Sequence, residues 1–288
     1  MMIAEHREAV IANIAAAAAA GAFHQKVEVN DPVLSAQQRQ DIVRNYLANR
    51  HSAAYRCKTL AARTLANLGT AFVNRTTEIV GMEKLKGLQG GAILTCNHFS
   101  PMDNTVVRHL VRKLGKKRIN IISQLTNFAM PGLIGFLMNY ADTIPLGDEA
   151  HYLLRQLPDI ISELTDRGEF VLIYPEQEMW FNYRKPRPCQ RGAYHFAAKL
   201  GLPVVSCFIE MCDEAQMDTA QFRKVRYRLH ILDILYPEQG KSVRETSIAL
   251  CEQDYSLKKA AYERIYAKPL DYTFEPSDIA GWTGELEQ

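Results

Sequence analysis

The sequence predicts an α/β fold in which a mostly parallel, mixed sheet is flanked by helices and preceded by an N-terminal helical segment. Two observations lead to this prediction. From Thr76 onward, short strand-like runs alternate with helical patterns, as in a sheet with helices on its faces. Before Thr76, helical periodicity occurs without strand-like runs. We therefore divide the chain into an N-terminal helical segment (1–75), an α/β domain (76–270) and an irregular C-terminal tail (271–288).

The N-terminal segment contains the patterns of three helices. Residues 10–23 are mostly alanine, which favours a helix over the alternative of a signal peptide because alanine has the highest helix propensity. A break follows at 30–32. Ser35 and Gln38 then form the capping-box pattern that begins a second helix, which reaches about Arg50.

The third helix, from about Ala53 to Val73, is amphipathic. Its apolar positions include Leu60, Leu65, Leu68 and Phe72, and its cations are Arg56, Lys58, Arg63 and, just beyond its end, Arg75. A basic amphipathic helix can lie on an anionic membrane surface, or it can pack on the protein core with its charges in water. The sequence leaves both arrangements open.

The α/β domain is predicted element by element from its periodicity. The predicted strands are residues 78–80, 92–96, 119–123, 143–146, 170–174, 204–209 and 225–232. The predicted helices are residues 101–114, 126–139, 149–167, 189–200 and 242–267. In parallel sheets, functional sites gather at the C-terminal ends of the strands, and both His98 and Glu176 follow such an end.

Composition excludes several classes of function. The net charge of +2 gives no sign of nucleic-acid binding. The six cysteines include no CxxC pair, which is typical of reduced cytoplasmic thiols, and no group of His, Cys and acidic residues has the spacing of metal ligands. No run of 18 apolar residues predicts a membrane-spanning helix.

The stretch from Asn97 to Asp103 is the strongest candidate for chemistry. Ser100 and Pro101 are typical of a helix start, so His98 lies outside the helix and can fold back toward Asp103 in the first turn. The carboxylate would then orient the imidazole, and His98 would act as a general base. The alternative is that Asp103 only stabilises the helix start and that His98 is an ordinary loop residue.

Four stretches in order resemble the glycerolipid acyltransferases, the 1-acylglycerol-3-phosphate acyltransferase family. They are Asn97-His98-Phe-Ser-Pro-Met-Asp103, similar to the NHxxxxD motif; Ile144-Pro145-Leu146; Phe170-Val-Leu-Ile-Tyr-Pro175-Glu176; and Arg191-Gly192-Ala193 followed by Gly201-Leu-Pro203-Val204. The resemblance covers about residues 77–235. It implies that His98 and Asp103 are catalytic and activate an acceptor hydroxyl for attack on an acyl thioester, without an acyl-enzyme.

The same resemblance implies the partners. The donor would be acyl-CoA or acyl carrier protein, or an acyl phosphate as in some bacterial relatives, and the acceptor a lysophospholipid such as 1-acylglycerol 3-phosphate. No metal or organic cofactor is expected. We expect a cytoplasmic protein that associates peripherally with the cytoplasmic membrane.

The sequence departs from the family pattern where the acceptor phosphate is usually bound. Gly147-Asp148 stands in place of Asp-Arg, and Gln177-Glu178-Met179 in place of Gly-Thr-Arg. A basic run follows, and its cations are either substrate contacts or part of a solvated loop. The predicted substrate-binding residues are Glu176, Arg184, Lys185, Arg187, Arg191, Ser100 and Asn97.

Three alternatives to this function follow from the same residues. The acceptor can lack a glycerol phosphate, as in another lysolipid, a glycolipid or an amine, because the usual arginine is missing at Asp148. Cys96, two residues before His98, can form a Cys–His pair that hydrolyses a thioester. Finally, the fold can serve a non-catalytic lipid-binding protein, although such a protein has no use for the His98/Asp103 pair.

Overall fold

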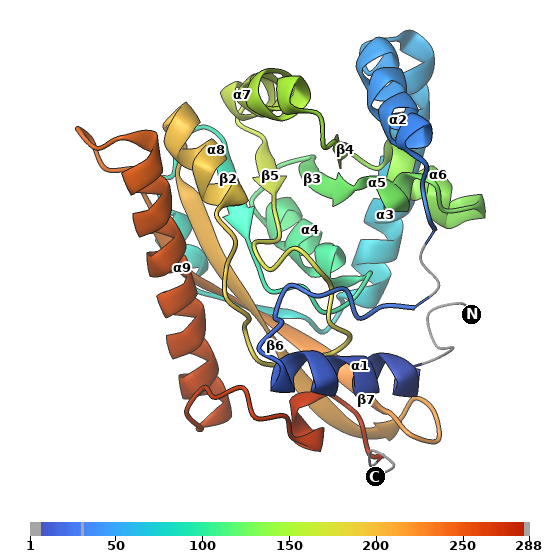
Figure 1. The fold of residues 1–288 in the computed structure, drawn as a ribbon, viewed down its shortest axis with the longest axis vertical. Helices are drawn as coiled ribbons and strands as arrows, with labels where there is room; N and C mark the ends of the chain where they lie inside the picture. The colour runs from blue at the N-terminus through green and yellow to red at the C-terminus, as the bar shows by residue number, and fades with distance from the viewer. Residues whose placement is uncertain (1–6, 30–31, 285–288) are drawn as a thin grey trace.

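The computed structural model describes residues 7–29 and 32–284 of the chain (Figure 1). Residues 30–31 of the break predicted at 30–32, the start of the N-terminal segment (1–6) and the end of the tail (285–288) lie outside the described residues. Three helices precede the sheet, namely α1 (Arg7–Ala19), α2 (Ala36–Asn49) and α3 (Ala53–Val73). The capping box at the start of α2 is confirmed, because Ser35 and Gln38 each accept the backbone N–H of the other.

One seven-stranded sheet forms the centre of the molecule, in the order β1-β7-β6-β2-β5-β3-β4. Its strands are β1 (Glu78–Val80), β2 (Ala92–Thr95), β3 (Ile119–Gln124), β4 (Thr143–Leu146), β5 (Phe170–Leu172), β6 (Val204–Met217) and β7 (Arg223–Leu235). The five strands from β6 to β4 are parallel, whereas β7 runs antiparallel to β6. The predicted mixed, mostly parallel sheet is therefore confirmed.

The remaining helices connect these strands or follow them. They are the 3-10 helix η1 (Met82–Leu85), α4 (Asp103–Lys113), α5 (Leu125–Phe128), α6 (Gly132–Tyr140), the π-helix η2 (Tyr152–Gln156), α7 (Leu157–Asp166), α8 (Gly192–Leu200), α9 (Val243–Tyr266) and the 3-10 helix η3 (Pro276–Asp278). Among the described residues, none of these helices combines the length and the apolar character needed to cross a bilayer.

Three predicted elements differ clearly from the structure for local reasons. The single helix predicted over 126–139 is divided into α5 and α6, because Pro131 lacks an N–H donor and lies in an extended conformation. Strands β6 and β7 are longer than predicted, with 14 and 13 residues, because they continue outward as a hairpin. The outer end of β6, residues 213–217, is mostly polar and exposed, so it carries no apolar pattern that marks a strand.

Helices cover both faces of the sheet. One apolar cluster joins one face of β2, β3 and β5 to side chains of α2, α7, α8 and α9. A second cluster joins the opposite face to α4, whose buried residues are Val106, Val107, Leu110 and Val111. In Figure 1, α9 runs along one side of the sheet, and α1 crosses in front of the β6–β7 hairpin.

A buried ion pair fastens α9 to the central strand β2. Asp254 and Lys258, one turn apart on α9, are both fully buried and form a salt bridge. Asp254 also accepts hydrogen bonds from Thr95 Oγ1 at 2.6 Å, from Tyr194 OH at 2.5 Å and from the Ser206 hydroxyl. Lys258 in turn donates to Thr95 Oγ1 at 3.0 Å. Every charged oxygen and nitrogen of the pair therefore has a protein partner, as a buried ion pair requires.

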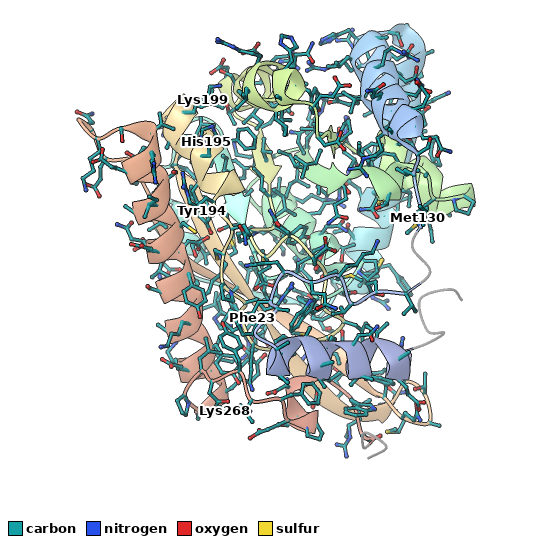
Figure 2. The ribbon with its side chains drawn as sticks, viewed as in Figure 1. Phe23, Met130, Tyr194, His195, Lys199 and Lys268 are labelled. Atoms are coloured by element: carbon teal, nitrogen blue, oxygen red, sulfur yellow. The ribbon has the colours of Figure 1, made fainter. Side chains whose placement is uncertain are left out.

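A third apolar cluster lies beyond the sheet, between α1 and three distant segments of the chain. Its buried members are Val10, Ile11, Ile14, Ala17, Ala18, Val27, Trp180, Phe181, Tyr183, Phe222 and Ile279. Residues 20–29, which follow α1, reach the loop after β5, and Phe23 lies at this contact (Figure 2). Residues 267–284 contain only the short helix η3, yet they pack here through Ile279 and two isolated β-bridges.

Candidate active site

His98 and Asp103 form a hydrogen-bonded pair at the C-terminal end of β2. His98 Nδ1 lies 2.7 Å from Asp103 Oδ2, and the side chains are 20% and 1% exposed. The same oxygen accepts the backbone N–H groups of Phe99 at 3.0 Å and Ser100 at 3.2 Å. The loop therefore curls around the Asp103 carboxylate, and this brings His98 and Asp103, five residues apart in sequence, into contact. Helix α4 begins at Asp103, two residues later than predicted, and Ser100 caps the turn before it by accepting from Met102 N–H.

Tyr174, two residues after the end of β5, completes this arrangement. Its ring stacks on the imidazole of His98, with the ring centroids 4.0 Å apart and the planes 14° apart. Its hydroxyl donates to Asp103 Oδ1 at 2.6 Å. Burial, followed by the nearby Asp103 charge, raises the pKa of Tyr174 well above its ordinary value, so the phenol keeps the proton that it donates.

Glu176 and Arg187 form a buried ion pair that binds both backbone polar groups of His98, its N–H and its carbonyl oxygen. The two side chains are 2% and 1% exposed, and Arg187 Nη2 lies 2.9 Å from Glu176 Oε2. Glu176 Oε2 accepts the His98 N–H at 3.3 Å, while Arg187 Nη2 donates to the His98 carbonyl oxygen at 3.4 Å. Arg187 Nη1 donates to the Phe23 carbonyl oxygen at 2.9 Å. Burial lowers the pKa of Arg187, and the charge of Glu176 opposes that shift.

The other cations of the basic run also have partners within the chain. Arg184 pairs with Asp213 at 2.5 Å, and Lys185 pairs with the buried Asp278 at 2.7 Å. Arg191, at the start of α8, donates to Ser247 Oγ at 3.2 Å. Of the predicted substrate contacts, the structure therefore brings Glu176 and Arg187 to the His98 peptide, while these three cations join the loop to β6, to the C-terminal segment and to α9. Anion binding by the basic run stays a prediction.

Asn97 and Ser100, also predicted to bind substrate, have different surroundings. Asn97 is 2% exposed, and its amide exchanges two hydrogen bonds with the backbone of Ile209 on β6, at 3.1 and 2.8 Å. The amide thus fixes the end of β2 against β6. Ser100 borders a cavity of about 330 Å³ between the start of α1, the end of α3 and the β6–β7 hairpin. Their role in binding stays a prediction.

The segment that departs from the family pattern after β4 is shaped by α2. Asp148 pairs with Arg39 of α2 at 2.7 Å. A Cβ atom at Gly147 would lie 2.8 Å from Val43 Cγ2 of α2 and 3.0 Å from the Tyr152 ring. A larger residue at position 147 would therefore require the side chains of Val43 and Tyr152 to shift.

Cys96 lacks the properties of a nucleophile. Its side chain is 1% exposed, and its thiol lies 3.3 Å from the Asn97 side-chain oxygen. Burial raises the pKa of Cys96 well above its ordinary value, which disfavours the reactive thiolate. Among the described residues, no group of three or more His, Cys, Asp or Glu side chains is placed to hold a metal ion.

The arrangement suits proton abstraction from a substrate. Nδ1 of His98 is fixed by Asp103, while no described residue bonds to Nε2, and the side chain is partly open to solvent. A buried carboxylate on one imidazole nitrogen and a free second nitrogen are the parts of a general base. Sequence analysis did not single out Tyr174, although it stands directly before Pro175-Glu176 in one of the four stretches that resemble the family.

Two comparisons with known proteins give a match, one to a family model and one to a crystal structure. Residues 76–210 match the model of the family described as Acyltransferase. The chain is also similar to the crystal structure of the 1-acyl-sn-glycerophosphate (LPA) acyltransferase PlsC from Thermotoga maritima, with 16% identity, a TM-score of 0.51, and coverage of 91% of this chain and 97% of that chain. At this identity the likeness shows a shared fold. A search of curated protein sequences gives no match.

Proposed function

Residues 76–210 belong to the acyltransferase family, and from this premise we propose that the enzyme moves a fatty acyl chain from an acyl thioester to the hydroxyl of a glycerophospholipid precursor. The donor is acyl-CoA or acyl carrier protein, and the acceptor is 1-acylglycerol 3-phosphate. The similar crystal structure is of a 1-acyl-sn-glycerophosphate acyltransferase, which supports this acceptor.

The observation that carries the proposal is the geometry of His98. Its Nδ1 bonds to the buried Asp103 at 2.7 Å, and its Nε2 has no partner among the described residues. The imidazole is thus held in the tautomer whose Nε2 can accept a proton. A base of this kind contributes about 10²–10⁴-fold to a rate.

The proposed reaction is a direct transfer. Nε2 takes the proton of the acceptor hydroxyl while the oxygen attacks the thioester carbonyl carbon, and the carbonyl π electrons move to its oxygen. When the tetrahedral intermediate collapses, the C–S bond breaks and the departing thiolate takes the proton from the imidazolium. Asp103 stabilises that imidazolium while it exists. The reaction in this form uses no cofactor besides the acyl thioester.

Two alternatives receive less support. Hydrolysis through Cys96 needs a thiolate, which burial of this thiol disfavours. A non-catalytic lipid-binding protein would not need His98 held by Asp103, and the family match favours an enzyme.

A second candidate acceptor, one without a phosphate, is favoured by a specific observation. Every cation of the basic run has a protein partner, and Asp148, at the place of the usual arginine, pairs with Arg39. None of these cations needs a substrate anion to balance its charge. A lysolipid with a neutral headgroup, a glycolipid or an amine is the alternative that these pairs favour.

The test is a transfer assay with one long-chain acyl-CoA and a panel of acceptors: 1-acylglycerol 3-phosphate, a neutral lysolipid without a phosphate, a glycolipid and a long-chain amine. We expect product with 1-acylglycerol 3-phosphate and a loss of at least 100-fold in His98→Ala. Product with only the other acceptors would support the second candidate. Undiminished transfer by His98→Ala would contradict the proposed base, and an acyl group trapped on Cys96 would contradict direct transfer.

We further propose that α3 rests on an anionic membrane surface of the cytoplasmic side. Its side chains Leu60, Leu65, Leu68 and Phe72 are 61%, 41%, 65% and 68% exposed. At 100° per residue they fall within a sector of about 140° around the helix axis, with Arg56 and Lys58 on its borders. An exposed apolar stripe edged by cations matches the chemistry of an anionic lipid surface.

Vesicle sedimentation tests this contact. We expect the enzyme to bind vesicles with 30% anionic lipid, and the double variant Leu68→Ser/Phe72→Ser to bind at least fivefold less. Leu154→Ser removes an equally exposed leucine from η2, at 55% exposure, and is the control. Equal binding by the double variant and the control would place the membrane contact elsewhere.

A further inference from the structure

Asp103 is shared between two side chains, and only one of them is His98. Its Oδ2 accepts from His98 and from two backbone N–H groups, while its Oδ1 accepts from the Tyr174 hydroxyl at 2.6 Å. Asp103 is 1% exposed, so these donors take the place of water around the carboxylate. The two oxygens thus serve different partners.

Tyr174 also contacts His98 directly. The two rings are nearly parallel, 14° apart, at a centroid separation of 4.0 Å. The ring of Tyr174 therefore limits rotation of the imidazole about its side-chain bonds, and its hydroxyl fixes the carboxylate that the imidazole faces. One side chain holds both members of the pair.

We propose that Tyr174 is a positioning residue of the catalytic pair, which sets the pH range in which His98 acts as a base by drawing part of the Asp103 charge toward its own hydroxyl. The inference rests on the proposed role of His98. A donor to one carboxylate oxygen withdraws charge from the other, so the imidazolium is stabilised less than it would be beside an unshared carboxylate. The bond from Tyr174 thus weakens the hold of the carboxylate on the imidazolium proton.

The raised pKa of Tyr174 is consistent with this role, because a phenol that stays protonated is a permanent donor. The Asp103 carboxylate has no hydrogen of its own to offer, which fixes the direction of this bond.

The first experiment uses Tyr174→Phe, which removes one oxygen and keeps the ring on His98. We expect the acid limb of the kcat/KM profile to move to higher pH by about 0.5–1 unit, since the whole carboxylate charge then faces the imidazole. The plateau rate should fall about 3–10-fold through looser orientation, and the KM values for donor and acceptor should stay within twofold. An NMR titration of the His98 ring protons should shift in the same direction.

Tyr227→Phe is the matched control. Tyr227 is another partly buried tyrosine close enough to Asp103 for that charge to contribute to its raised pKa, after burial, but no described residue hydrogen-bonds to its hydroxyl. Its removal should leave the acid limb in place. A profile for Tyr174→Phe that superimposes on wild type, or an equal shift in Tyr227→Phe, would overturn the inference.

A second variant keeps the inference testable if Tyr174→Phe does not fold. Replacing only Tyr174 by 3-fluorotyrosine makes the phenol a stronger donor and should move the acid limb to lower pH. No movement, or movement to higher pH, would overturn the inference. These results are separate from the proposed function, which fails if His98→Ala remains active whatever Tyr174 does.

Discussion

Two buried aspartates at opposite faces of β2 have similar partners and different consequences. Asp254 accepts from Tyr194 and faces a lysine, while Asp103 accepts from Tyr174 and faces a histidine. Lys258 is fully buried, whereas His98 is 20% exposed and has one nitrogen without a described partner. The Asp254–Lys258 pair, the closed pair, has all its hydrogen bonds made and holds helices in place. The Asp103–His98 pair, the open pair, leaves one nitrogen accessible and can take part in chemistry.

The largest expected effect tests the open pair. Asp103→Asn keeps the shape of the side chain but cannot stabilise an imidazolium in the same way. We expect kcat/KM for acyl transfer to fall about 10²–10⁴-fold, while the free energy of unfolding falls by about 1–3 kcal/mol because several donors lose a charged acceptor. Activity within threefold of wild type would remove Asp103 from the catalytic pair.

The matching change in the closed pair should affect stability instead. Asp254→Asn leaves the Lys258 charge buried without a counter-charge, and we expect the free energy of unfolding in urea to fall by about 3–5 kcal/mol. The folded fraction should keep nearly normal kcat/KM. Asp159→Asn, at an exposed position on α7, is the control and should change stability by less than about 0.5 kcal/mol. A folded but inactive Asp254→Asn enzyme would contradict the assignment of Asp254 to stability and of Asp103 to catalysis.

The smallest effect is a dependence on pH that belongs to the closed pair. Burial pushes the pKa of Asp254 upward, but Lys258 and the hydroxyl donors outweigh it, so the pKa lies below its ordinary value. A lowered folded-state pKa gives stability that is complete above the unfolded value, about 4, and is lost as the pH falls through the folded value. The stability gap between wild type and Asp254→Asn should therefore narrow below about pH 4. Urea unfolding at pH 7, 5, 4 and 3 measures it, and a constant gap would contradict the assigned shift.

Much of the fold follows from local patterns. The strand predicted at 143–146 and the helix predicted at 53–73 have the observed bounds, because the apolar period and the turn residues there are unambiguous. The division of the helix predicted at 126–139 shows the limit: Pro131 ends one helix, but whether a second begins at once depends on packing. The outer end of β6, residues 213–217, has no apolar period to detect.

The candidate site was predictable only where its residues are close in sequence. His98 and Asp103 belong to one motif, so their pairing could be proposed from spacing and helix-start residues. The partners of Arg184 and Lys185 are 29 and 93 residues away, at Asp213 and Asp278, and no local pattern marks a carboxylate that far along the chain. Tyr174 follows the end of β5 and His98 follows the end of β2, so their contact depends on the parallel pairing of these two strands.

The docking of α1 has a consequence for how the chain folds during synthesis. The Phe23 carbonyl that receives Arg187 lies 164 residues before it, and at about 5–20 residues per second the ribosome needs roughly 10–30 s to make that interval. Helix α1 is thus complete long before its binding surface exists. Alanine favours the helix and adds little apolar surface. Only a few larger apolar side chains, such as Val10, Ile11 and Ile14, can therefore form non-native contacts before the rest of the chain is made.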